Sequence, residues 1–417
     1  MIDFAYRVLL ATNAAYLALQ PTNVATYGRS LTFGVAALLA LCGIAVSLAG
    51  RGRRIPGPGT ALLAALAAWS LWECASVLWS VNPDYSAGEM RREILWSLMM
   101  MAAFYVATRD ALAWRVVVIS AITSFALLAA FAVGFALSPE SWDAGRWHNG
   151  VGAFSTWMVL VAPLLLTLVA PAPAGFGGGR LAVALGVVLL ALLLVTARLV
   201  DNRMVWVALA AVFFTASTLA ALRWRAALRR TPMRWLVPLV ALLVVLVLLF
   251  AQTAREKALA HFPPQTSVAQ TFTADPRLQL WDHTLERIRE RPWAGYGYGK
   301  SILAQELRTE LHDPLLSHAH NVFMSQWLQT GAVGLVLFCA LMGVLLWRYA
   351  GFLRAPDDTL AFLGLIGISL VAGFLVKNLT DDFLFRSNGK EFWALNAALL
   401  GYAVRRERGA DPAAMPR

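Results

Sequence analysis

Two histidines and an asparagine stand at the start of a long apolar segment, and side chains of these types can move a proton. The stretch from His318 to Gly334 reads HAHNVFMSQWLQTGAVG. A neutral imidazole can accept a proton near pH 7 and orient an attacking hydroxyl, so His320 is the leading catalytic candidate, with His318 and Asn321 as supporting groups. Polar groups are costly in hydrocarbon, which predicts a site at the membrane surface. The alternative is that His320 only caps a helix.

Two arginines begin predicted helices and are candidates for binding an anion. Arg203 opens the apolar run that follows Asn202, and Arg277 comes shortly after the potential cap Asp275. Free backbone N–H groups and the helix dipole favour negative charge at such positions, so the two arginines predict a phosphate clamp, with Arg198 as a further candidate. The alternatives are snorkelling for Arg203 and a solvated loop charge for Arg277.

Two adjacent carboxylates follow the next apolar segment. The stretch 378–393, NLTDDFLFRSNGKEFW, places Asp381 and Asp382 near the surface at which the histidines are expected. They could orient the histidine or one of the arginines. The alternative is a polar turn between two spans.

The composition predicts the elements that must position these residues. Of 417 residues, 59% are hydrophobic and 14% are charged, whereas soluble domains carry roughly 25% charge. We therefore expect an all-α polytopic membrane protein that forms a single transmembrane domain over residues 1–417. About twelve transmembrane helices are predicted, near 3–20, 31–49, 60–79, 94–108, 112–137, 152–170, 181–198, 203–222, 234–252, 320–349, 359–379 and 390–404.

Arginines in the short loops set the predicted orientation. With the amino terminus inside, the inner loops and the tail hold the arginines, as the positive-inside rule requires. The long segment 253–319 then lies outside, as a large periplasmic loop that precedes the histidine helix. Although the net charge is +11, the arginines form no basic stripe, so nucleic acid is not an expected partner.

The predicted outer loop contains an amphipathic helix near residues 276–291. Its apolar residues recur at three- and four-residue steps before Pro292 ends the pattern. We expect this helix to lie along the membrane surface. The sequence GYGYG at 295–299 then forms a turn that brings Tyr296 and Tyr298 near whatever the loop covers.

These elements together resemble the O-antigen ligase (WaaL) family, within the group that also holds O-antigen polymerases and bacterial protein O-oligosaccharyltransferases. The matching motifs are HN at 320–321 followed after nine residues by GAVG, NRMVW at 202–206, and PRLQLW with RPWAGYGYG between 276 and 299. The histidine, Arg203 and Arg277 match the family's essential residues. NRMVW departs from the serine-arginine pair common in the wider group, so that Asn202 is the cap of the helix that Arg203 begins.

The resemblance implies a GT-C-like fold and a glycosyltransferase in the bacterial inner membrane, with its active site facing the periplasm. Such enzymes transfer a glycan from undecaprenyl pyrophosphate to a sugar hydroxyl of the lipid A core, with inversion and without a metal. The partners are this donor, this acceptor and membrane lipids. The alternatives are a polymerase or protein-glycosylating relative with the same donor, and a transporter that binds the phosphate only.

No metal or other cofactor is expected. The predicted first outer loop, QPTNVATYGRS, has no acidic residue, whereas many metal-dependent lipid-linked glycosyltransferases keep one there. Paired carboxylates favour a divalent cation in principle, and Asp84, Glu89 and Glu93 leave a metal site open as the alternative.

Overall fold

Helices make up all the regular structure of the described residues. The computed structural model describes residues 2–19, 21–22, 26–50, 54–137, 150–169, 179–225, 232–261, 276–311 and 317–409. Within them, nine helices are long and apolar enough to cross a membrane, so the chain is a polytopic membrane protein. They are α2 (Thr26–Leu48), α3 (Thr60–Ala75) with its extension η1 (Ser76–Trp79), α6 (Ala111–Ala136), α8 (Val151–Val169), α9 (Arg180–Val200), α10 (Arg203–Arg223), α12 (Pro232–His261), α16 (Val322–Arg354) and α17 (Asp358–Lys377).

Three of the twelve predicted spans are helical but fall short of those nine. The first, α1 (Ile2–Leu19), contributes only a shorter apolar helix. The second, α5 (Trp96–Ala107), has 12 residues and continues from α4 (Pro83–Met90) through the π-helical turn η2 (Arg91–Leu95). The third, α18 (Arg386–Glu407), has 22 residues but carries charged side chains near both ends. The number of apolar residues in a segment does not by itself distinguish such helices from helices that cross the membrane.

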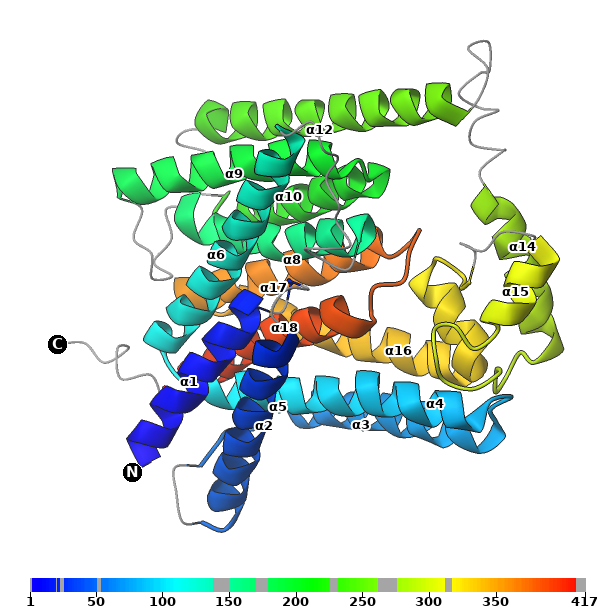
Figure 1. The fold of residues 1–417 in the computed structure, drawn as a ribbon. Helices are drawn as coiled ribbons and strands as arrows, with labels where there is room; N and C mark the ends of the chain where they lie inside the picture. The colour runs from blue at the N-terminus through cyan, green and yellow to red at the C-terminus, as the bar shows by residue number, and fades with distance from the viewer. Residues whose placement is uncertain are drawn as a thin grey trace.

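The helices α8 and α17 form the centre of the bundle. In their spans 83% and 78% of the residues are buried, against 11% in that of α12, and α17 packs against α8, α10, α16 and α18 (Figure 1). Small residues allow this close approach. Gly367 lies under the Tyr349 ring, and Gly373 faces Val212 of α10. A side chain at either glycine would push the neighbouring helix away.

The helix α16 is broken one-third along its length, at Gly331, which has a φ of 72°. Backbone hydrogen bonds join the residues around the break to residues before α16. The amides of Tyr296 and Gly297 donate to the carbonyls of Leu328 and Gln329 at 3.0 and 2.8 Å, and the amide of Ala332 donates to the Pro292 carbonyl at 2.8 Å. The segment 292–297 is therefore joined directly to the α16 backbone.

Residues 276–311 form a small module at one end of the bundle, which we call the loop module. It contains α14 (Pro276–Glu290) and α15 (Ala304–Leu311), beside the first turns of α16 (Figure 1). Its core holds Leu280 and Ile288 from α14 together with Leu307 from α15 and Leu328 from α16. The apolar face of α14 is thus largely covered by protein, although we had expected it to lie along the membrane surface.

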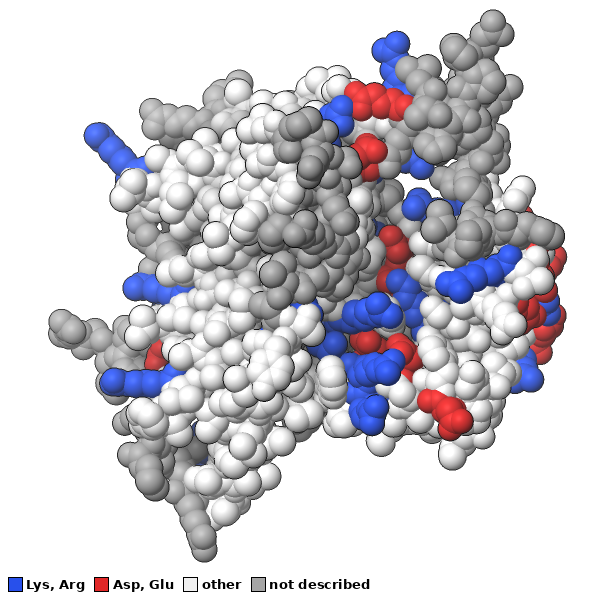
Figure 2. Space-filling view, in the orientation of Figure 1, with Lys and Arg blue, Asp and Glu red and all other residues white. Residues whose placement is uncertain are grey.

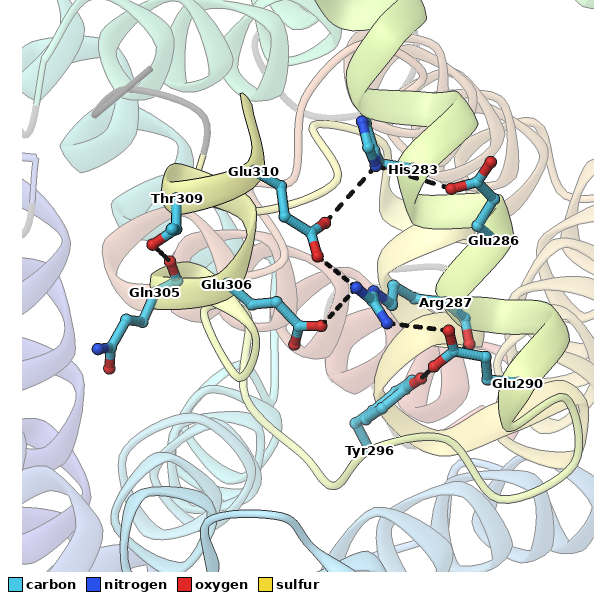
Figure 3. Close-up of polar contacts among 9 residues, drawn as sticks. All are labelled: His283, Glu286, Arg287, Glu290, Tyr296, Gln305, Glu306, Thr309 and Glu310. Carbon is cyan, nitrogen blue, oxygen red and sulfur yellow. Dashed lines mark hydrogen bonds and ion pairs between the residues drawn. The ribbon is translucent and has the colours of Figure 1, made fainter. Parts of the chain in front are cut away.

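An arginine at the centre of the loop module joins its two helices. Arg287 contacts the carboxylates of Glu290 at 2.9 Å, Glu306 at 2.8 Å and Glu310, as Figure 3 shows. His283 lies beside the same Glu310 carboxylate at 3.5 Å. Three carboxylates around one guanidinium hold α14 and α15 in a fixed relation.

Candidate active site

Several helix ends meet where the bundle faces the loop module. The residues before α16 carry the two histidines, and the turn 378–385 joins α17 to α18. Asn321 connects the two segments. Its Oδ1 caps α16 by accepting hydrogen bonds from the Phe323 and Met324 amides, and its Nδ2 donates to the Leu379 carbonyl at 2.9 Å. The cap therefore fixes the histidines against the turn that carries the two aspartates.

His318, His320 and Asp381 form the centre of the site. The His320 Nδ1 lies 3.4 Å from Asp381 Oδ1, and the His318 Nε2 lies 3.8 Å from the same oxygen. The two imidazole centroids are 3.8 Å apart. All three side chains are largely but not fully buried, with exposed fractions of 11%, 19% and 15%. His320 adopts a φ of 47°, a left-handed backbone that is uncommon for a residue other than glycine and that clusters at functional sites.

Burial lowers the pKa of His318 to about 3, with Lys300 and His320 acting in the same direction and Asp381 opposing them. Burial alone would raise the pKa of Asp381. The contacts of His318 and His320 and the charges of Lys377 and Lys300 outweigh it and hold the pKa well below its usual range. Asp381 is therefore ionised and His318 neutral near pH 7.

The ionised carboxylate selects the tautomer of His320. Because Nδ1 faces Asp381 Oδ1, the proton belongs on Nδ1 and the free lone pair on Nε2. A carboxylate that orients an imidazole in this way also stabilises the imidazolium that forms on proton transfer. The pair can therefore act as a general base.

Basic side chains surround the histidine centre. Figure 2 shows Lys and Arg side chains gathered at the recess between the apolar body and the loop module. Lys300 donates to the Asp382 carbonyl at 2.5 Å, and its Nζ lies 5.2 and 5.1 Å from the Phe383 and Phe385 ring centroids. Arg277, at the start of α14, lies close enough for its charge to act on the Lys377 ammonium. Arg277 therefore lies within electrostatic range of Lys377, whose charge in turn acts on Asp381.

Arg203 lies at the same end of the bundle. Its helix α10 begins at an Asn202 cap, whose Oδ1 accepts from the Met204 amide at 3.0 Å. The helix runs antiparallel to α17, since Arg223 at its far end bonds Asp358 at the start of α17. Gly373 faces Val212, near the middle of α10. The first turn of α10 is therefore level with the end of α17.

Three other predicted residues have different partners. Arg198 forms an ion pair with Glu256 of α12 at 2.6 Å. The Tyr296 hydroxyl donates to Glu290 at 2.7 Å, inside the loop module. Tyr298 is 6% exposed, and its amide donates to the Ser76 hydroxyl at 2.9 Å. These contacts join structural elements and do not reach the histidine centre. The buried Asp382 contacts it through its backbone, since its amide donates to Asp381 Oδ1 at 2.9 Å and its carbonyl accepts from Lys300.

Lys300 and Lys377 were not among the residues singled out from the sequence. The chain has four lysines against 31 arginines, which made each lysine an outlier. One directly follows GYGYG and the other ends an apolar span. That rarity was the only available signal, because nothing in the local pattern places either lysine beside the histidines.

Among the described residues, His318, His320 and Asp381 could together hold a metal ion. Their ligand atoms lie within 4.8 Å of one another. Imidazole and carboxylate ligands suit a divalent transition metal. The positive charges of Lys300, Lys377 and Arg277 act on the same small region, however, and disfavour the binding of a metal cation there.

The family model described as O-antigen ligase matches residues 185–339, from within α9 through the first half of α16. That range contains the starts of α10 and α14, the loop module and His320. The resemblance proposed from the motifs is therefore confirmed over this part of the chain. No curated protein matches the chain.

Proposed function

We propose, from the O-antigen ligase domain at residues 185–339, that this chain is an O-antigen ligase. It transfers a glycan from undecaprenyl pyrophosphate to a sugar hydroxyl of the lipid A core. The reaction takes place at the periplasmic face of the bacterial inner membrane. The observation that carries the proposal is the His320–Asp381 pair, which lies beside a group of basic side chains at one end of a membrane bundle.

In this proposal His320 activates the acceptor. Its Nε2 takes the proton of the acceptor hydroxyl while that oxygen attacks the anomeric carbon from the face opposite the leaving group. The bond to the pyrophosphate oxygen breaks in the same displacement, so the configuration inverts. Asp381 holds the imidazole in place and balances its positive charge.

Arg203 and Arg277 bind the pyrophosphate of the donor. A departing pyrophosphate gains negative charge on its bridging oxygen, and preorganised cationic donors stabilise such charge at about 2.7–4 kcal/mol per donor. Arg277 and Arg203 begin helices at this end of the bundle, where the helix dipoles add to their charge. Transfer is proposed to proceed without a metal, because these side chains supply the positive charge.

Reconstituted transfer with purified enzyme tests the proposal. Lipid-linked glycan and lipid A core are mixed with wild type or with His320→Ala, with and without a chelator. Wild type should extend the core under both conditions, and His320→Ala should keep the wild-type melting temperature and lose transfer. A normal product ladder from the alanine variant would contradict the role of His320. Loss of transfer on chelation, restored by adding back the ion, would instead assign the His318–His320–Asp381 set to a metal.

The second candidate is a polymerase or a protein O-oligosaccharyltransferase. It is favoured by the matched range, which describes a family defined by its donor chemistry and leaves the acceptor open. Offering lipid A core, a second lipid-linked glycan and an acceptor protein in parallel separates the candidates. Product on the core alone supports the ligase.

A further inference from the structure

Lys377 is a buried cation without a hydrogen-bond or ion-pair partner in the described part of the protein. It is the last residue of α17, and the residue is 1% exposed. Its ammonium makes no hydrogen bond and no ion pair with any described residue, and it lies 5.0 Å from the Phe383 ring centroid. A buried ammonium in that condition is strongly unfavourable unless something else accepts its hydrogen bonds.

A second buried cation shows what a structural role looks like in this fold. Arg405 is 6% exposed, and its Nη1 donates to the carbonyls of Gly401 at 2.7 Å and Tyr105 at 3.0 Å, with Thr108 at 3.5 Å. Its donors are thus used to connect α18 with the end of α5. Lys377 connects nothing in this way.

The charges around Lys377 favour an anion there. Asp381 attracts the ammonium from a distance, while Arg277 and Lys300 repel it. The Asp381 carboxylate already faces both imidazoles. A Cβ at Gly152 would overlap the Phe383 ring and come within 3.3 Å of an Asp381 oxygen, so the amino end of α8 also abuts this turn. Three cations and a helix amino terminus therefore lie near the Asp381 carboxylate, and the buried Asp382 carboxyl interacts with Lys300 and Asp381.

We propose that Lys377 is a substrate-binding residue that donates hydrogen bonds to a phosphate oxygen of the lipid-linked pyrophosphate, from beneath the histidine centre. The assignment rests on the proposed function and extends it, because it adds to the arginines a cation that comes from the central helix α17. The ammonium stays unpaired in the free protein and gains its partner when the donor binds. Binding strength at the site is thereby obtained at the expense of the stability of the free protein.

The test uses inorganic pyrophosphate and the full chain in detergent micelles. Three variants are compared with wild type: Lys377→Met, which keeps the length of the side chain and removes the charge; Lys377→Arg, which keeps the charge; and Lys390→Met as the matched control. Lys390 stands on α18 at the same end of the bundle, with its Nζ 5.2 Å from the Trp96 ring centroid. The dissociation constant is measured by titration calorimetry, and the melting temperature is measured with and without pyrophosphate.

Lys377→Met should bind pyrophosphate about 10- to 100-fold more weakly, as expected for loss of a hydrogen bond to a charged group. Its melting temperature without pyrophosphate should equal or exceed that of wild type, and pyrophosphate should raise it less. Lys377→Arg should recover part of the affinity, and Lys390→Met should bind like wild type. Wild-type affinity in Lys377→Met would overturn the assignment. A lower melting temperature together with normal affinity would also overturn it, by showing a structural role.

The binding measurement needs neither glycan nor acceptor. If pyrophosphate binding depends on Lys377 but no lipid A core is modified, the proposed ligase activity fails and the binding site stands. If the core is modified equally well by wild type and Lys377→Met, the binding site fails and the ligase stands.

Discussion

At the scale of single residues, the two histidines have different environments although they lie side by side. His318 is held neutral by burial, whereas His320 is turned by its left-handed backbone so that Nδ1 faces Asp381. The second imidazole packs against the first with centroids 3.8 Å apart. This difference is why the proposed mechanism assigns the base to His320 and gives His318 the part of a neighbour that packs against it.

Replacing Asp381 by Asn should slow the chemical step. The amide can donate to His320 Nδ1, which would place the imidazole proton on Nε2 and remove the base. We expect kcat to fall by about 10²- to 10⁴-fold with little change in KM, as when the carboxylate of a catalytic triad is replaced. Steady-state transfer assays measure this. Asp382→Asn is the control, and equal losses in both variants would contradict a specific role for Asp381.

The buried neutral His318 predicts a stability that depends on pH. Its folded pKa of about 3 lies below the ordinary value of 6.5, so the unfolded chain binds its proton first as the pH falls. The stabilisation is complete above pH 6.5 and is lost progressively toward pH 3, by up to about 5 kcal/mol. Melting temperatures recorded across this range should fall with pH in wild type. They should fall less steeply in His318→Gln, and parallel curves would refute the assignment.

The sequence identified residues whose type alone suggests chemistry and missed those whose role depends on packing. His320 and Arg277 were found because a polar residue at a helix start is visible as a pattern. Their proximity to Asp381 was left open, since 60 positions separate His320 from Asp381 and only the packing of α16 against α17 brings them together. Lys377 was missed because one lysine at the end of a span also fits simple snorkelling.

At the scale of elements, the break in α16 decides how the loop module is attached. Gly331 lies against the Trp293 carbonyl, and the adjacent carbonyls of Leu328 and Gln329 are used by the segment 292–297. The Trp72 indole of α3 also donates to the Thr330 carbonyl at 2.9 Å. Sequence patterns predicted α9, α10 and α16 well. They could not show that GAVG marks a break, because glycine within an apolar run is equally common in unbroken membrane helices.

Two glycines of α16 should respond oppositely to alanine. A Cβ at Gly331 would overlap the Trp293 carbonyl, and its φ of 72° would be strained by about 1–3 kcal/mol in addition. Gly343 has nothing within 4 Å of its Cβ position, so alanine there should be neutral or stabilising by up to about 1 kcal/mol. Melting temperatures in detergent compare the two variants. Similar values for both would show that the break is not required.

At the scale of the whole molecule, charge is divided between the two ends of the bundle. Several of the described arginines predicted to lie inside pair with acidic residues. The pairs are Arg109–Asp110, Arg223–Asp358, Arg348–Glu407 and Arg406–Asp357. The opposite end holds the histidine centre and the acidic and basic residues of the loop module. This division agrees with the orientation predicted from the loops, which stays a prediction.

Cysteine labelling tests that orientation. In a chain whose three cysteines (Cys42, Cys74 and Cys339) are replaced by alanine, single cysteines are placed at the exposed positions Arg308 and Arg354. A thiol reagent that does not cross membranes should label Arg308→Cys in intact spheroplasts. It should label Arg354→Cys only after lysis. The reverse pattern would place the loop module, and with it the proposed active site, in the cytoplasm.

The backbone connection between the loop module and α16 also bears on how this protein can be recombined with its relatives. The segment 292–297 shares main-chain hydrogen bonds with the helix break, so α14, which carries Arg277, and α16, which directly follows His320, are joined through the backbone. A chimera that exchanges only the loop would separate carbonyls from the amides that fit them. Exchange of both elements together preserves them. We therefore expect substrate preference to transfer between relatives only when the loop module and the part of α16 before Gly331 are exchanged together.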